Sequence, residues 1–225
     1  MNANSPEELT SASPGERDAH VRERDEREVE NGFRQYDAAI AIIESHVIDK
    51  RPFALRASMI QQLQKIAVDG IEPTAGEYRS EKVEIWGSKH EPPPAFRVRD
   101  LVQEMCDYVN DNLHEKSAFH LAAYIMWRLN WIHPFPDGNG RTSRIISYIV
   151  LSAKLGYVLP GSPTIPEQIQ QDRTGYFAAL EAADRAIENG GEVDVSEMEK
   201  LLKGMLARQL LSVITAADGS ASEWS

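Results

Sequence analysis

The sequence predicts a single, mainly α-helical domain with one short β-hairpin. Apolar residues recur at spacings of three and four through most of the chain, and only one stretch alternates apolar with polar residues. The length of 225 residues suits one domain with a hydrophobic core. We expect a disordered segment at 1–18, a domain at 19–216 with its core at about 76–190, and a polar tail at 217–225.

Two amphipathic helices are expected before the hairpin, because their apolar residues recur at the spacing of one helical face. The first should run from about Val21 to about Ile48, and the second from about Leu55 to near Gly70. The residues that mark them are Tyr36, Ile40, Ile43 and Val47 in the first, and Leu55, Met59, Leu63 and Ile66 in the second.

Residues 76–94 have a different pattern. Val83 and Ile85 alternate with polar neighbours, Gly87 offers a turn, and Pro92–Pro94 cannot continue a strand. We therefore expect a short, exposed hairpin in this segment.

Five helices should follow the hairpin, the second of them buried on most sides, with a turn-rich segment from Gly156 to Pro166 after the third. The residues that mark them are Leu101, Met105 and Val109; Ala122, Met126 and Leu129; Ile145 and Ile149; Tyr176, Leu180 and Ala183; and Met198, Leu202 and Met205.

Charge and cysteine content exclude several classes of function. A net charge of −11 disfavours a protein that binds nucleic acid through its overall electrostatic field. Cys106 is the only cysteine, so an intramolecular disulfide and a four-cysteine zinc site are excluded. Neither a secretory signal nor a membrane-spanning stretch is recognisable. We expect a cytoplasmic protein with no nucleic-acid or membrane partner.

One run of the chain brings together a base, an acid, two arginines and glycines that can expose backbone N–H groups. It begins at residue 133 and reads His-Pro-Phe-Pro-Asp-Gly-Asn-Gly-Arg-Thr-Ser-Arg. Gly138 and Gly140 flank Asn139 and can bend the backbone so that successive N–H groups converge on an anion. A helix that starts here would direct its N-terminus at the same point, with Arg141 and Arg144 three residues apart. The run is suited to bind a polyphosphate.

Two reactive side chains belong to the same run. The imidazole of His133 can accept a proton near neutral pH, so it is the expected general base. Asp137 offers a hard carboxylate oxygen of the kind that holds Mg²⁺ together with substrate phosphates. A tight turn would explain the residues Asp-Gly-Asn-Gly, but not the histidine before them or the arginines after them. A calcium loop fails because Thr142 stands where glycine is required, and no P-loop occurs.

This run resembles the signature of the Fic family, His-x-Phe-x-Asp/Glu-Gly-Asn-Gly-Arg-x-x-Arg, and matches it at every defined position. Gly87-Ser88, His90 and Pro92–Pro94 are similar to the end of the family's flap. The resemblance covers about Gln35 to Leu211 and implies a Fic-type helical bundle with a short β-hairpin flap.

The activity that the resemblance implies is transfer of AMP from ATP to a Ser, Thr or Tyr hydroxyl of a target protein. His133 would be the catalytic base, Asp137 would hold Mg²⁺, and Phe135 would anchor the loop. The nucleotide would be bound by Gly138, Asn139, Gly140, Arg141 and Arg144, the last of these at the γ-phosphate.

The resemblance also implies protein partners. A target protein would dock its main chain on the flap. Many family members carry an inhibitory helix, Ser/Thr-x-x-x-Glu-Gly/Asn, whose glutamate pairs with the second arginine. Glu30-Asn31 fits the end of that pattern, but Glu26 stands where Ser or Thr is expected. If Glu30 is inhibitory, Glu30→Gly should raise activity; otherwise a separate inhibitory partner is expected.

Other functions stay open. Transfer of UMP, phosphocholine or phosphate, or removal of AMP, would use the same motif, although phosphorylating relatives carry a lysine in place of Gly140. The alternative from a different class is a non-catalytic module that binds a partner through the flap, and the intact base disfavours it.

Overall fold

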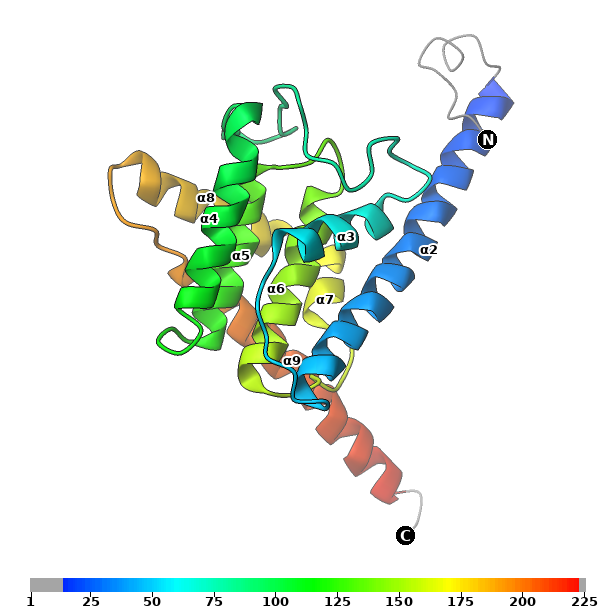
Figure 1. Cartoon of the computed structure of the whole chain (residues 1–225). Coiled ribbons are helices and arrows are strands. Elements are labelled where there is room, and N and C mark those ends of the chain that lie inside the picture. The colour runs from blue at the N-terminus through cyan, green and yellow to red at the C-terminus, as the bar shows by residue number, and fades with distance from the viewer. Residues whose placement is uncertain (1–13, 223–225) are drawn as a thin grey trace.

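A computed structural model describes residues 14–222, which form a bundle of α helices (Figure 1). The mainly α class is confirmed. The helices are α2 (Pro14–Val47), α3 (Ala57–Ala67), α4 (Val98–Asp111), α5 (Ala118–Ile132), α6 (Asn139–Leu155), α7 (Ile165–Gln171), α8 (Thr174–Glu188) and α9 (Ser196–Ser222), with a 3-10 turn, Ala95–Arg97, before α4. The disorder expected at 1–18 falls outside the described residues up to position 13, and α2 has begun by position 14.

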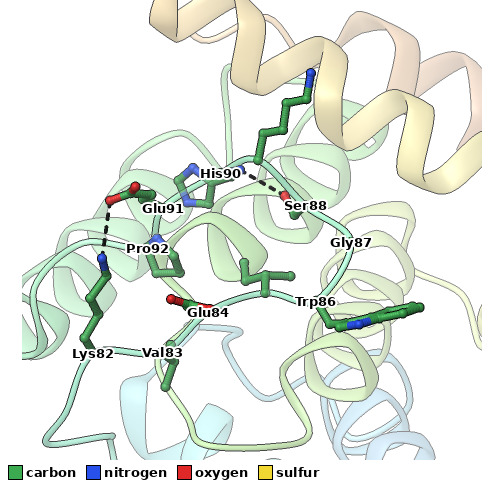
Figure 2. Close-up of a pocket in the computed structure, with 11 residues that line it drawn as sticks. Lys82, Val83, Glu84, Trp86, Gly87, Ser88, His90, Glu91 and Pro92 are labelled. Atoms are coloured by element: carbon green, nitrogen blue, oxygen red, sulfur yellow. Dashed lines mark hydrogen bonds and ion pairs between the residues drawn. The ribbon is translucent and has the colours of Figure 1, made fainter.

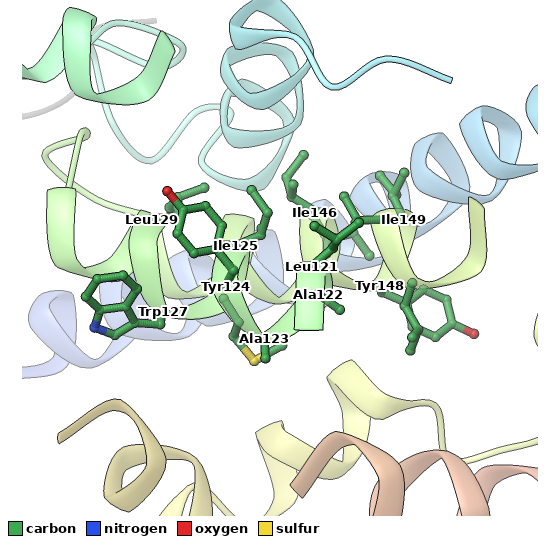
Figure 3. Close-up of a cluster of buried hydrophobic side chains, with 14 of the residues drawn as sticks. Leu121, Ala122, Ala123, Tyr124, Ile125, Trp127, Leu129, Ile146, Tyr148 and Ile149 are labelled. Carbon is green, nitrogen blue, oxygen red and sulfur yellow. The ribbon is translucent and has the colours of Figure 1, made fainter. Parts of the chain in front are cut away.

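The centre of the bundle is the pair α5 and α6 (Figure 3). The Ser117 hydroxyl caps α5 by accepting a hydrogen bond from the His120 N–H at 3.0 Å. Apolar residues surround the axis of α5, so that most of its side chains are buried, as expected. Ile146 and Ile149 of α6 are fully buried in the same core. Burial on all sides fixes both helices, and with them the loop that joins them.

The other helices surround this pair. α2 packs against α3 and α6, whereas α4, α8 and α9 pack against α5. The first turns of α2 and the last turns of α9 extend beyond the bundle (Figure 1). Within residues 14–222, no helix has the length and apolar character needed to cross a membrane.

The β-hairpin expected within residues 76–94 is not confirmed, because the described part of the chain contains no β strand. Gly87 does form a turn, with φ of 77°, and the Ser88 N–H donates to the Ile85 carbonyl at 3.0 Å. No ladder of main-chain hydrogen bonds extends from this turn within the described residues, and Pro92–Pro94 have no N–H to contribute. We call residues 82–92 the flap loop (Figure 2).

Helix α7 lies at the end of the segment predicted to be turn-rich. It has seven residues, too few to show a helical period, and Pro166 lies in its first turn, where a missing N–H costs nothing. The other helices lie where the apolar spacing predicts them, but α2 begins at Pro14 rather than about Val21, and α9 continues to Ser222, through positions expected to form a polar tail.

Candidate active site

The loop between α5 and α6 has left-handed backbone at both ends. His133 ends α5 with φ of 49° and ψ of 60°, and Gly138 precedes α6 with φ of 79°. The Asn139 side chain closes the loop, since its Oδ1 accepts the Phe135 N–H at 3.0 Å and its Nδ2 donates to the Phe135 carbonyl at 2.7 Å. Phe135 is fully buried, as expected of a loop anchor. Asn139 therefore shapes the loop with its side chain and can offer a ligand its N–H.

Gly138→Ala is expected to lower the free energy of unfolding by about 2–4 kcal/mol. The backbone is left-handed at this position, and an added Cβ would lie 2.8 Å from Cγ1 of Val68. Urea denaturation measures the change. Gly204→Ala is the control, because a Cβ at Gly204, within helix α9, meets open space and should stabilise the helix slightly. Equal effects at the two glycines would contradict the assigned loop geometry.

The N-terminus of α6 opens into a cavity of about 360 Å³. Its cap residue is Gly138, and no side chain caps the helix. The first N–H groups of α6 and the positive end of its dipole therefore remain for an anion. The cavity brings together all seven site residues predicted from the sequence: His133, Asp137, Gly138, Asn139, Gly140, Arg141 and Arg144.

One ring nitrogen of His133 is engaged. Its Nδ1 lies 3.3 Å from the carbonyl oxygen of Asn130, so this nitrogen carries the proton and donates it, which leaves the lone pair on Nε2. Burial lowers the pKa of His133 to about 4; the Asn130 carbonyl raises it, nearby Arg79 and His90 lower it further, and Asp137 raises it. The ring is therefore neutral at pH 7, as a general base must be.

The His133 ring should titrate with a pKa near 4 rather than the ordinary 6.5. Because burial penalises the charged form, the ring stays neutral as the pH falls and binds a proton only near pH 4. Two-dimensional NMR of the ¹⁵N-labelled imidazoles measures this, and the signal that disappears in His133→Ala assigns it. An ordinary value near 6.5 would show that the ring is not desolvated.

Asp137 lies in a network of charges. Its Oδ2 is 3.2 Å from Nη2 of Arg141 and 3.4 Å from Nη2 of Arg24, and its Oδ1 accepts the Gly138 N–H. Residues 14–222 contain no group of three or more His, Cys, Asp or Glu that could hold a metal by themselves. A single partly exposed carboxylate nevertheless fits Mg²⁺, which binds through one or two carboxylates and takes its remaining ligands from phosphates and water.

Arg144 is a buried cation on the first turns of α6. It is 8% exposed, and its Nη2 donates to Oε1 of Gln170 at 3.2 Å. Arg173 donates to the same oxygen at 2.9 Å. No carboxylate within the described chain lies in ion-pair range of Arg144, and burial lowers the pKa of its guanidinium. An uncompensated buried charge of this kind favours an anionic ligand.

Helix α2 reaches the same cavity. Oε2 of Glu28 lies 3.6 Å from Nη1 of Arg141, and Arg24 contacts Asp137. Glu30 is exposed and has no hydrogen bond or ion pair within the described residues, whereas neighbouring Asn31 is buried and donates to the Asp69 carbonyl at 2.8 Å. The glutamate that meets an arginine of the motif is therefore Glu28 rather than Glu30.

Several residues of the cavity are missing from the sequence prediction. Arg24 and Glu28 of α2, Gln170 of α7 and Arg173, which precedes α8, line it from segments distant in sequence. Gln64 of α3 supports it from behind, since its Nε2 donates to the Asp137 carbonyl at 2.9 Å. One feature of the sequence could have indicated Gln64: it is a polar residue at a core position of an amphipathic helix. In the structure its side chain is fully buried.

Comparison with known proteins gives the family. Residues 54–151 match the sequence profile of the Fic/DOC family. The matched segment, which contains the whole motif at residues 133–144, is a Fic/DOC domain. "Protein adenylyltransferase Fic" of Aedes aegypti is 31% identical over 153 residues, which cover 66% of this chain and 28% of that protein. The protein of the same name from Drosophila willistoni is 30% identical over 148 residues, 64% of this chain and 28% of the relative.

Solved structures share the fold of this chain. A Fic domain containing signaling protein from Bacteroides thetaiotaomicron superposes with a TM-score of 0.66 at 22% identity, over 84% of this chain and 73% of that chain. The Fic-1 structure from C. elegans gives a TM-score of 0.64 at 21% identity, over 83% and 51%. The helical bundle is therefore that of Fic proteins, while this chain spans less than a third of the curated relatives it matches.

Proposed function

We propose that this Fic/DOC protein is a protein adenylyltransferase, which transfers AMP from ATP to a Ser, Thr or Tyr hydroxyl of a target protein. The observation that carries the proposal is one cavity in which a neutral histidine with a free Nε2 faces an uncapped helix N-terminus and two arginines of the motif. The names of the matched relatives support it.

In this reaction the hydroxyl oxygen attacks the α-phosphorus of ATP, its proton passes to Nε2 of His133, and the bond to the β-phosphate breaks to release pyrophosphate. The N–H groups of Asn139 and Gly140 would hold phosphate oxygens at the start of α6, and the Gly138 N–H would join them once it releases the Asp137 carboxylate. Arg141 would neutralise the charge that develops on the transferred group, and Arg144 would bind the γ-phosphate. Mg²⁺, held by Asp137, would supply further charge neutralisation when bound.

Intact mass spectrometry tests the proposal. After incubation with ATP and Mg²⁺, the purified protein or an added acceptor protein should gain the mass of one AMP per modified site. UTP, CDP-choline and the pre-adenylylated protein are tested in parallel. A gain only with one of the other donors, or loss of AMP from the modified protein, would replace adenylyl transfer with that reaction; no change in any arm would favour a partner-binding module.

We further propose that the acceptor protein docks on the flap loop, where Trp86 is 99% exposed and points away from the loop (Figure 2). The one cysteine, Cys106, is buried and unpaired, which suits a reducing cytoplasm. The ion pair between Glu28 of α2 and Arg141 is partly exposed and therefore weak. We therefore also propose a separate inhibitory partner.

Glu28→Ala is expected to raise the rate of AMP transfer by up to about fivefold, the equivalent of one partly exposed ion pair. Its carboxylate competes with phosphate for Arg141, and removing it leaves the guanidinium with one carboxylate partner, Asp137, instead of two. Glu30→Ala is the matched control from the same helix and should leave the rate unchanged. Initial rates at subsaturating ATP measure both. A rise in Glu30→Ala alone would restore Glu30 as the inhibitory residue.

A further inference from the structure

Arg79 is a buried charge outside the cavity. It is 4% exposed, and no carboxylate in residues 14–222 pairs with it. Its Nε donates to the His133 carbonyl at 2.7 Å and its Nη2 to the Ile132 carbonyl at 3.3 Å, while its own main-chain N–H donates to the Pro134 carbonyl at 2.9 Å. The last carbonyls of α5 have no helical partner, and the guanidinium satisfies two of them at the negative end of the helix dipole.

The same guanidinium binds both ends of the flap loop. Nη1 donates to the Glu81 carbonyl at 2.9 Å, and Nη2 also donates to the Pro93 carbonyl. Glu81 and Pro93 immediately flank residues 82–92, so one side chain closes the loop at its base. An arginine is suited to this because its planar fork presents five N–H groups in fixed directions, which a lysine does not.

A second side chain connects the loop to α5. Nε2 of His90 donates to the Trp131 carbonyl at 2.7 Å, and the two rings lie 5.3 Å apart, centre to centre. Two further polar contacts of the loop are exposed: Lys82 pairs with Glu91 at 3.5 Å, and the His90 N–H donates to the Ser88 hydroxyl at 3.1 Å (Figure 2). Pro92, at the end of the loop, is buried. In place of a strand ladder, Arg79 and His90 connect the loop to the main chain of α5 by hydrogen bonds.

We propose that Arg79 is a positioning residue that fixes the flap loop and the main chain of His133 relative to each other, so that a bound acceptor hydroxyl meets the catalytic base. This inference rests on the proposed AMP transfer. A shift of about 1 Å in a group that orients reactants can cost on the order of 100-fold in rate. Arg79 does not line the cavity at the start of α6, so its effect is on the distance between the base and the surface that presents the acceptor.

The experiment compares Arg79→Met, Arg79→Lys and His90→Ala with wild type, using Arg51→Met as an exposed control. Three quantities are measured: kcat for transfer to an acceptor protein, KM for ATP, and amide hydrogen exchange. In Arg79→Met we expect kcat to fall by about 10- to 100-fold, KM for ATP to stay within about twofold, and amides of residues 82–92 to exchange at least about tenfold faster. Arg79→Lys keeps the charge but not the fork, so it should recover only part of kcat.

Unchanged kcat and unchanged exchange of residues 82–92 in folded Arg79→Met would overturn the inference, as would a loss confined to KM for ATP. If Arg79→Met does not fold, His90→Ala decides, because this half-buried side chain makes one of the loop's connections to α5 and should give the same pattern at smaller amplitude. Absence of transfer in wild type would refute the proposed function, and the exchange data would still test the anchoring of the loop.

Discussion

His133→Ala is expected to lower kcat for AMP transfer by about 10²–10⁴-fold, the usual contribution of a positioned general base. The ring has its proton on Nδ1, bound to the Asn130 carbonyl, and a free lone pair on Nε2, and His133 lines the cavity at the start of α6. Truncation removes the proton acceptor and leaves the arginines and the N-terminus of α6 in place. KM for ATP should therefore change little, and the measurement is kcat with the acceptor at saturation.

His114→Ala is the control for this variant, because His114 is exposed in the turn between α4 and α5. Calorimetric binding of a non-hydrolysable ATP analogue separates chemistry from binding: His133→Ala should bind the analogue as tightly as wild type. Transfer at the wild-type rate would remove His133 from the reaction. A matching loss of analogue binding would show that the ring contributes to the ground-state complex instead.

The motif could be predicted from the sequence because its geometry is local. Gly138 has the left-handed backbone that glycine permits, Asn139 binds Phe135 four residues away, and the arginines follow on the same helix. These features join residues that are close in sequence, so the local pattern alone indicates them. The helices could also be predicted from local sequence, because the spacing of their apolar residues shows which face of each helix packs against the core.

Contacts between distant segments could not be predicted in this way. Glu28 reaches Arg141 only because α2 packs on α6, and Arg173 joins Arg144 through a shared Gln170. The hairpin prediction depended on the alternation at Val83 and Ile85, which is too short to identify a partner strand. In the structure a side chain, not a ladder, closes that loop.

Arg144→Met is expected to raise KM for ATP by about 10- to 100-fold, the equivalent of one charge-assisted contact to phosphate of about 1.5–3 kcal/mol. The same variant should not lose stability. Its guanidinium is buried with no carboxylate within ion-pair range in the described chain, so its desolvation is uncompensated in the absence of ligand. Replacing such a charge with an apolar side chain of similar length is often neutral or stabilising.

Opposite responses of binding and stability are what distinguish a ligand-binding arginine from a structural one. Thermal denaturation without nucleotide and ATP titration of the same samples measure both quantities, with Arg185→Met as the control, because Arg185 is exposed and pairs with Glu181. A parallel loss of stability and binding in Arg144→Met would mean that the bond to Gln170 holds α6 to α7 and that the phosphate effect is indirect. If ATP binding weakens while stability is unchanged or higher, then the buried charge of Arg144 lowers the stability of the protein and serves to bind the anionic substrate.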